Sequence, residues 1–326
     1  MVEGKSRFHE VREGCHMNDI IRVGMIGISE GNGHPFSFSS IINGYSDTGL
    51  ANSGWDGIYN YVRVRDRSEF GIQNLKVTHA WTQDHEQTKK LCDAAMIPCA
   101  AGNFEDMVGN IDALILARDD YENHLAMVRL FLETGLPVFI DKPLSLNIDE
   151  LKYFIPYLEQ GKLMSCSGLR YAKELDPVRR NMESYGGNLF VRGSVLFSWE
   201  KYGIHMLEAI LSMLNTRPVS VYSIPVSHSS AIIKMSDGST IQIDAFGHVP
   251  KIFKIDVIGE KQISSHDISD NFTMFHRMLW HFAEMIRTGE SVIPPQQTLD
   301  IMKVLIAGNI SRTEKREVLL EEFEDI

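Results

Sequence analysis

The chain has 326 residues, 44% of them hydrophobic and 23% charged, with a formal net charge of −11. This is the composition of a globular protein long enough for two domains. The acidic balance and the lack of a basic run argue against nucleic acid as the main partner. No apolar run reaches the roughly 20 residues that cross a bilayer. Four scattered cysteines and no His-Glu-x-x-His pair predict free thiols in a reducing cytoplasm, without a metal site.

The first predicted strand follows a polar start. Residues 1–17 are mixed in charge and lack periodicity, so we expect a loose extension there. Residues 20–27 form an apolar run that ends at a glycine, which is typical of a central parallel strand. A glycine-rich turn comes next, and then a predicted helix from about Phe36 to Tyr45.

Strand, glycine turn and helix in this order are the context of a dinucleotide-binding fingerprint. Backbone amides in such a turn approach a pyrophosphate at a helix N-terminus. The fingerprint is irregular because Ser29 stands in place of the second glycine, so a glycine-rich turn of no special use remains the alternative. The cofactor candidates in this turn are Gly27, Ser29, Glu30, Gly31, Asn32, Gly33 and His34.

Residues 46–74 keep neither a helix period nor a strand period for long. We interpret them as an inserted loop near the mouth of the nucleotide site.

Two further strand–helix units follow. A strand over residues 75–82 leads into a helix over 83–95, and a strand over 111–117 leads into a helix from about His124 to Thr134. An acidic residue usually ends the first of these strands and binds the ribose of NAD. Thr82 occupies that place and Asp84 follows two positions later, which leaves NAD and NADP open. The additional cofactor candidates at these strand ends are Thr82, Ala117, Arg118 and His124.

The segment 136–141 predicts a buried strand that ends at Asp141-Lys142-Pro143. Proline removes a backbone donor and stops the strand, so Lys142 stands at its carboxyl end, where open α/β sheets bind ligands. A primary amine there can donate a proton to a substrate oxygen. A solvated surface lysine is the alternative.

The pattern changes in the second half. Long strands dominate from residue 189 to 259, including a hairpin with an Asp-Gly turn, which predicts a large and mostly antiparallel open sheet. We therefore expect an α/β fold with a dinucleotide-binding Rossmann domain over 18–145, a doubly wound parallel sheet. An α+β domain over 146–326 would bind substrate and form a homodimer or homotetramer through its sheet.

His205 stands at the predicted start of a helix that continues to Leu214, directly after Gly203. An imidazole in the first turn can relay a proton near neutral pH. A core histidine bonded to a carbonyl is the alternative.

In this order and spacing, the first strand with Gly27, the Asp141-Lys142-Pro143 turn and the helix start at His205 resemble the glucose–fructose oxidoreductase, inositol dehydrogenase and MocA-like family. The resemblance covers nearly the whole chain from Ile20. It implies NAD or NADP as cofactor. It also implies that Lys142 matches the lysine of the family's Glu-Lys-Pro motif, with Asp141 in place of the glutamate, and that His205 matches the family's histidine. The family usually has aspartate four residues before this histidine, where this chain has Lys201.

The resulting hypothesis is an NAD(P)-dependent oxidoreductase that acts on a secondary alcohol of a sugar, cyclitol or sugar derivative. Lys142 is the candidate proton donor or acceptor and His205 the relay, with Asp141 and Lys142 also beside the cofactor. A phosphorylated or nucleotide-linked sugar stays open. The alternatives are a non-catalytic NAD(P)- or sugar-binding sensor of the same fold, and an enzyme whose bound NAD is reduced only transiently. The substrate-binding candidates are Arg170, Tyr171, Glu200, Lys201 and Tyr202.

Overall fold

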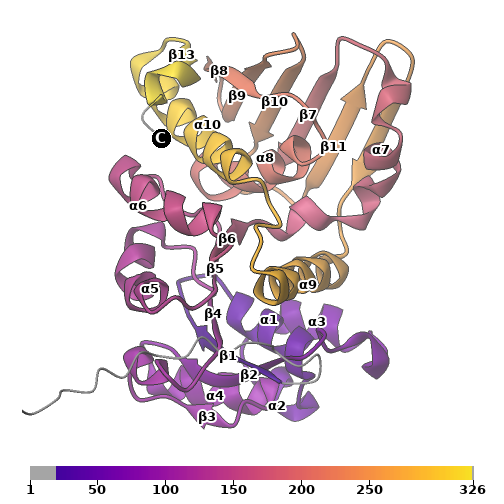
Figure 1. Cartoon of the computed structure of the whole chain (residues 1–326). Helices are drawn as coiled ribbons and strands as arrows, with labels where there is room; N and C mark the ends of the chain where they lie inside the picture. Colours follow the sequence, from indigo (N-terminus) through magenta and orange to yellow (C-terminus); the bar gives the residue numbers. More distant parts are fainter. Residues whose placement is uncertain (1–19, 325–326) are drawn as a thin grey trace, which may run out of the picture.

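The computed structural model describes residues 20–324, so the extension predicted over residues 1–17 lies outside the described residues. Two β-sheets divide the chain. The indigo-to-magenta half carries the first sheet and the pink-to-yellow half the second, with helix α9 at the junction between them (Figure 1).

Within residues 20–324, the first sheet has six strands in the order β3-β2-β1-β4-β5-β6. Every neighbouring pair is parallel, as predicted for a Rossmann sheet. Its central strands are completely buried because both faces are covered, which explains their continuous apolar sequences. The strands are β1 Ile21–Ile26, β2 Leu75–Trp81, β3 Cys99–Ala100, β4 Ala113–Leu116, β5 Val138–Asp141 and β6 Leu163–Cys166. The helices of this half are α1 His34–Asn43, α2 Asp47–Ala51, α3 Asp56–Val62, α4 His85–Ala95, α5 His124–Glu133 and α6 Ile148–Glu159.

The first sheet extends past the predicted boundary at residue 145. Strand β6 pairs with β5 in register, with Val138 opposite Leu163 and Asp141 opposite Cys166. Helix α6 provides the crossover between the two parallel strands. The sheet therefore ends only at Cys166, after one more strand–helix unit than we expected.

The prediction of a loop over residues 46–74 was wrong in part. Two short helices, α2 and α3, occupy most of it. Ser46 caps α2 by accepting a hydrogen bond from the Gly49 amide, and α2 packs against α4. The segment does lie beside the glycine turn, because a Cβ atom on Gly33 would meet Trp55 at 2.5 Å.

Glycine at position 27 is required by packing. A Cβ atom there would lie 2.3 Å from Cγ of Pro35, at the start of α1. We expect Gly27→Ala to lower the free energy of unfolding by about 1–3 kcal/mol through overpacking, measured by chemical denaturation. Gly57→Ala is the matched control, because a Cβ atom on Gly57 in helix α3 would meet nothing within 4 Å. It should be neutral or stabilising by up to about 1 kcal/mol. Equal effects of the two variants would contradict this account.

The second sheet is the predicted large, mostly antiparallel one. Within the described residues it has seven strands in the order β12-β11-β7-β10-β9-β8-β13, and only β7 and β10 pair in parallel. The strands are β7 Phe190–Val195, β8 Pro218–Pro225, β9 Ser229–Met235, β10 Thr240–Ala245, β11 Phe253–Ile258, β12 Ile263–Asp267 and β13 Val318–Leu319. The helices of this half are α7 Asp176–Arg180, α8 Ile204–Leu211, α9 Asn271–Thr288 and α10 Pro295–Glu314. Helix α8 ends at Leu211, three residues before the predicted end.

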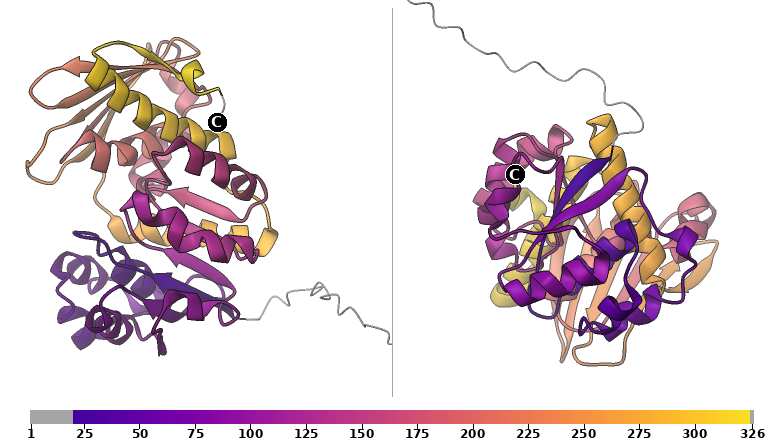
Figure 2. Two further views of the ribbon diagram at one scale, coloured as in Figure 1. Left: turned by 90° about the vertical axis from the view of Figure 1, so that its left-hand side faces the viewer. Right: turned by 90° about the horizontal axis from the view of Figure 1, so that it is seen from below.

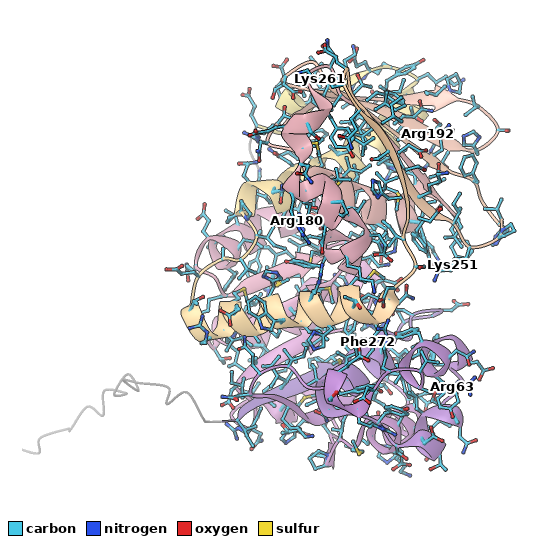
Figure 3. The ribbon with its side chains drawn as sticks, turned by 90° about the vertical axis from the view of Figure 1, so that its right-hand side faces the viewer. Arg63, Arg180, Arg192, Lys251, Lys261 and Phe272 are labelled. Carbon is cyan, nitrogen blue, oxygen red and sulfur yellow. The ribbon has the colours of Figure 1, made fainter. Side chains whose placement is uncertain are left out.

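Aromatic rings join the two halves. Phe275 of α9 lies edge-on to Phe38 of α1, with ring centroids 5.2 Å apart, and also contacts His34 at 5.1 Å. Phe282 of the same helix contacts Phe139 of β5 at 5.8 Å. Helix α9 thus runs along the top of the first half and under the second, as the two side views show (Figures 2 and 3).

No helix between residues 20 and 324 is long and apolar enough to cross a membrane. The same part of the chain holds no group of three or more His, Cys, Asp or Glu residues that could bind a metal ion.

Candidate functional site

The glycine turn between β1 and α1 has the features of a dinucleotide site. Helix α1 starts after Gly33 with no acidic residue in its first turn, which suits the approach of a phosphate to its N-terminus. Its first amides are already paired, because the His34 N–H donates to Asn32 Oδ1 at 2.9 Å and the Phe36 and Ser37 N–H groups donate to the Gly33 carbonyl. Gly31 adopts a φ of +76°, and a Cβ atom there would meet nothing within 4 Å, so the turn is open at this point. A depression of about 500 Å³ lies beside the turn. Its lining residues are Ile28, Ser29, Glu30, Gly31, Ser53, Gly54, Trp55, Gln83, Asp84, Gln87 and Lys90. These residues fit a dinucleotide.

At the end of β2, Gln83 rather than Thr82 reaches the glycine turn. Thr82 is buried, and its hydroxyl donates to the Asp84 carbonyl at 2.6 Å, so it is not available to a ribose. The Gln83 amide exchanges two hydrogen bonds with the backbone of Ile28 and accepts one from Arg118. Gln83 was not among the predicted cofactor residues, although it directly follows Thr82.

Arg118 and His124 hold the end of β4 together. Arg118 donates to both oxygens of Asp120 as well as to Gln83. His124 is completely buried, with its two ring nitrogens 3.1 Å and 3.0 Å from the carbonyls of Leu144 and Arg118. Burial lowers the pKa of His124. These contacts give His124 a structural role and lend no support to the prediction that it contacts cofactor; the neighbouring Ala117 is also completely buried.

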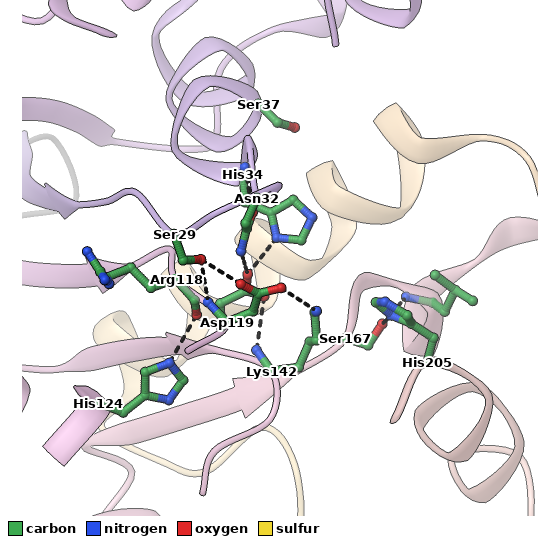
Figure 4. Close-up of polar contacts among 12 residues, drawn as sticks. Ser29, Asn32, His34, Ser37, Arg118, Asp119, His124, Lys142, Ser167 and His205 are labelled. Atoms are coloured by element: carbon green, nitrogen blue, oxygen red, sulfur yellow. Dashed lines mark hydrogen bonds and ion pairs between the residues drawn. The ribbon is translucent and has the colours of Figure 1, made fainter. Parts of the chain in front are cut away.

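Asp141 ties the glycine turn to the end of β5. It accepts hydrogen bonds from His34 Nδ1 at 2.5 Å, from the Asn32 amide at 3.0 Å and from the Lys142 backbone N–H at 2.9 Å (Figure 4). Burial opposes ionisation of Asp141, but the charge and hydrogen bond of His34 outweigh it and lower its pKa to about 2. Asp141 thus fixes the glycine turn to the end of β5.

This low pKa predicts acid sensitivity. The folded-state pKa of Asp141, about 2, lies below the ordinary value of 3.8, so its ionised form stabilises the fold above pH 4. That stabilisation, about 2 kcal/mol, is lost as pH falls from about 4 towards 2. Asp141→Asn should therefore destabilise the protein more at pH 5 than at pH 2.5 in denaturation experiments. The exposed Asp93 provides the control Asp93→Asn. If the loss caused by Asp141→Asn were the same at both pH values, this linkage would be refuted.

Lys142 extends from the same strand end to Asp119. Its ammonium donates to Asp119 Oδ2 at 3.3 Å, and its side chain is only 5% exposed. Asp119 also accepts a hydrogen bond from the Ser29 hydroxyl at 2.5 Å and returns one from its own amide at 3.1 Å (Figure 4). One carboxylate thus joins the glycine turn to the candidate proton donor. Asp119 was not among the predicted residues, although it follows the strand expected to end on the ligand side.

His205, which belongs to the second half of the chain, lies near Lys142, with Tyr202 in contact with both. A π-helical turn over Trp199–Gly203 leads into α8 and puts His205 in its first turn, where Nδ1 lies 2.6 Å from the Ser167 hydroxyl. The Tyr202 ring lies 4.9 Å from the His205 ring and 6.0 Å from the Lys142 ammonium. Burial and then the charge of Lys142 hold the pKa of His205 well below its usual range, so the imidazole is neutral. Burial and the Asp119 charge raise the pKa of Tyr202.

A cleft of about 840 Å³ opens beside these residues. Two of the five predicted substrate residues line it and three do not. Lys201 and Tyr202 line the cleft together with Asp119. Glu200 does not line it but forms an ion pair with Arg312. The remaining lining residues are Glu30, Gly31, Phe197, Ser198, Tyr222, Ser223, Ile224, Pro225, Val226, Ser227, His228, Ser229, Ala245, Phe246, Gly247, His248, Ser311, Arg312 and Lys315.

Arg170 and Tyr171 are not part of this cleft. Arg170 is buried, and its Nε donates to Glu208 at 2.6 Å while Nη1 donates to Gln297 at 2.7 Å. Tyr171 stacks on His281 with ring centroids 4.5 Å apart. Both line a separate cavity of about 580 Å³ beside α9. The prediction that they bind substrate therefore gains no support from the cleft next to Tyr202.

Residues 21–167 match the model of the GFO_IDH_MocA oxidoreductase family, which has an NAD-binding Rossmann fold. Over these residues the match agrees with the resemblance read from the sequence, to an oxidoreductase family with an NAD-binding Rossmann fold. The matched Gfo/Idh/MocA region ends just after β6, at the same place as the first sheet.

Solved structures share the fold of the whole chain. An apo scyllo-inositol dehydrogenase from Lactobacillus casei has a TM-score of 0.72 at 14% identity, covering 94% of this chain and 100% of that one. A myo-inositol 2-dehydrogenase from Lactobacillus plantarum has a TM-score of 0.72 at 16% identity, covering 92% and 99%. A probable dehydrogenase from Thermotoga maritima has a TM-score of 0.70 at 14% identity, covering 93% and 100%. The comparison with curated proteins found no match.

Proposed function

We propose that this protein is a dehydrogenase or reductase that transfers hydride between NAD(P) and a secondary alcohol of a cyclitol, sugar or sugar derivative. The observation that carries the proposal is the convergence of Lys142, from the first half, with Tyr202 and His205, from the second, next to the glycine turn. Two structural neighbours support the substrate class: a scyllo-inositol dehydrogenase with bound NAD(H) and scyllo-inositol, and a myo-inositol dehydrogenase in complex with NAD(H) and myo-inositol.

The glycine turn would hold the dinucleotide. The start of α1, with no acidic residue in its first turn, suits the negative charge of its pyrophosphate, and the depression that includes Trp55 and Gln83 suits its adenosine. A bound nicotinamide would accept or supply the hydride. Ser29 would meet the pyrophosphate through its amide, while its hydroxyl stays with Asp119.

Lys142 would handle the proton. When the alcohol is oxidised, its oxygen loses a proton and carries growing negative charge, so an adjacent amine lowers the barrier by accepting the proton. In the reverse direction the ammonium donates that proton to the carbonyl oxygen. Asp119 holds the ammonium in place and itself lines the cleft, which puts Lys142 directly behind the cleft wall although it is not one of the lining residues.

His205 would act as the relay. Its Nδ1 is occupied by Ser167, whose oxygen already accepts a hydrogen bond from the Leu169 amide, so the Ser167 hydroxyl is free to donate to Nδ1. Nε2 would then carry the ring proton. A neutral imidazole in this state can donate from Nε2 to a substrate oxygen.

The direct test is to incubate the purified protein with NAD or NADP and a panel of cyclitols and sugars, and to follow the absorbance of the reduced nicotinamide at 340 nm. Accumulation of NADH or NADPH with at least one polyol is the expected result. Cofactor binding without reduction across the panel would favour a sensor. Product formation without net reduced cofactor would favour the transient-reduction chemistry.

A further inference from the structure

We infer that the substrate carries a negatively charged group, a carboxylate or a phosphate, which binds at the end of the cleft away from Lys142. This inference rests on the proposed function, because it places the reacting hydroxyl of the same molecule at Lys142. It assigns the substrate class more narrowly than the structural neighbours do, since their inositol substrates are neutral.

The wall of the cleft contributed by the second half is basic. Lys201, Arg312 and Lys315 line it, and the only carboxylates along the cleft, Glu30 and Asp119, come from the first half. Glu200 pairs with Arg312, but neither Lys201 nor Lys315 has an ion-pair partner among the described residues. Acidic residues outnumber basic ones in the whole chain, 43 to 32, so composition alone would not be expected to give a cleft wall without lining carboxylates.

Tyr202 connects the candidate proton donor with the basic residues of the cleft. The centroid of its ring lies 6.0 Å from the Lys142 ammonium, and Lys201, which precedes it in the chain, also lines the cleft. The contact between Glu200 and Arg312 brings the C-terminal end of α10 to the same turn, and Lys315 follows one helical turn after Arg312. A substrate in the cleft is therefore flanked by Asp119, which holds Lys142, and by three cations of the second half.

Lys201 lies on the wall of the cleft. A cation in a partly enclosed cleft attracts anions and gives a neutral polyol no comparable advantage. The volume of about 840 Å³ leaves room for a charged substituent beyond one sugar ring, between the rings of Phe197, Tyr222 and Phe246.

Calorimetric titration of the full-length protein in saturating NAD tests the inference. The probes are glucose as the neutral reference, glucuronate as a carboxylate, and glucose 1-phosphate and UDP-glucose as phosphates. We expect at least one anionic probe to bind about 10-fold more tightly than glucose, with the difference shrinking as NaCl is added. The stronger anionic probe identifies carboxylate or phosphate as the group recognised.

Charge-reversal variants locate the effect. Lys201→Glu and Lys315→Glu should each weaken the preferred anionic probe by about 10-fold and leave NAD binding unchanged. Lys261→Glu is the matched control, because Lys261 is exposed on the second half, outside the cleft (Figure 3). Melting curves of all three variants verify folding.

Three results would overturn the inference. They are equal affinity for glucose and the anionic probes, no anionic probe binding below about 10 mM, or a preference that survives in the Lys201→Glu, Lys315→Glu double variant. Because binding alone is measured, anion binding without any reduction of NAD(P) would count against the proposed function and not against the anionic site.

Discussion

Lys142→Met should lower kcat by about 1,000-fold while leaving the affinity for NAD(P) nearly unchanged. Proton transfer by a positioned side chain contributes about 100- to 10,000-fold to catalysis. Methionine has nearly the length of lysine and suits a site that is 5% exposed, but it can neither donate nor accept the proton. Stopped-flow reduction of NAD(P) measures the chemical step, and fluorescence titration measures cofactor binding.

The control for this variant is Lys261→Met, on the exposed surface of the second half, which should have wild-type kinetics. If Lys142→Met retained turnover within about 3-fold of wild type, Lys142 would not be the proton donor. If the variant lost NAD(P) binding and activity together, Lys142 would contribute to the cofactor site instead.

Arg170→Ala should cause the largest loss of stability, about 3–5 kcal/mol in the free energy of unfolding, because it leaves a buried charge unpaired. Its partner Glu208 is only 1% exposed. Burial already raises the pKa of Glu208, and Arg170 opposes that rise. Without the guanidinium, Glu208 takes up a proton on folding more readily than in the unfolded chain. The variant should therefore be more stable at pH 5 than at pH 8, since stability falls with pH wherever the native state binds more protons.

Arg180→Ala is the matched control. Arg180 has a 76% exposed side chain whose nearest carboxylate, Asp176, is 3.8 Å away, so its loss should change stability by less than about 0.5 kcal/mol. The double variant Arg170→Met, Glu208→Leu should recover much of the stability lost in Arg170→Ala, because it removes both charges. A loss of under about 1 kcal/mol in Arg170→Ala would show that the ion pair does not hold α8 to the end of β6.

Much of the fold could be predicted because buried parallel strands have continuous apolar sequences, as in β1, β4 and β5. The helices α2 and α3 could not, since each spans only five to seven residues, too few to establish a helical period. The boundary at 145 was placed too early because β6 resembles a first strand of the next domain until its pairing with β5 is known.

The candidate site residues could be proposed only from local position in the chain. Lys142 was chosen because it ends a strand and His205 because it starts a helix after a glycine, and their roles stay predictions. Arg170 was misplaced because its partner Glu208 lies 38 residues further along the chain, and no local pattern distinguishes a buried arginine from one that faces substrate. Asp119 was missed for the same reason, since its importance comes from contacts with Ser29 and Lys142, distant in sequence.

The aromatic contacts between α9 and the first half limit how substrate can enter the cleft. Swinging the two halves apart, as hinged two-domain enzymes do, would expose Phe275, Phe38 and Phe282, which are now 6%, 0% and 0% exposed. At about 2 kcal/mol for each ring returned to water, such a hinge motion is strongly disfavoured. Entry and product release are therefore expected through the open mouth of a crevice that stays formed, which includes residues of the β8–β9 hairpin.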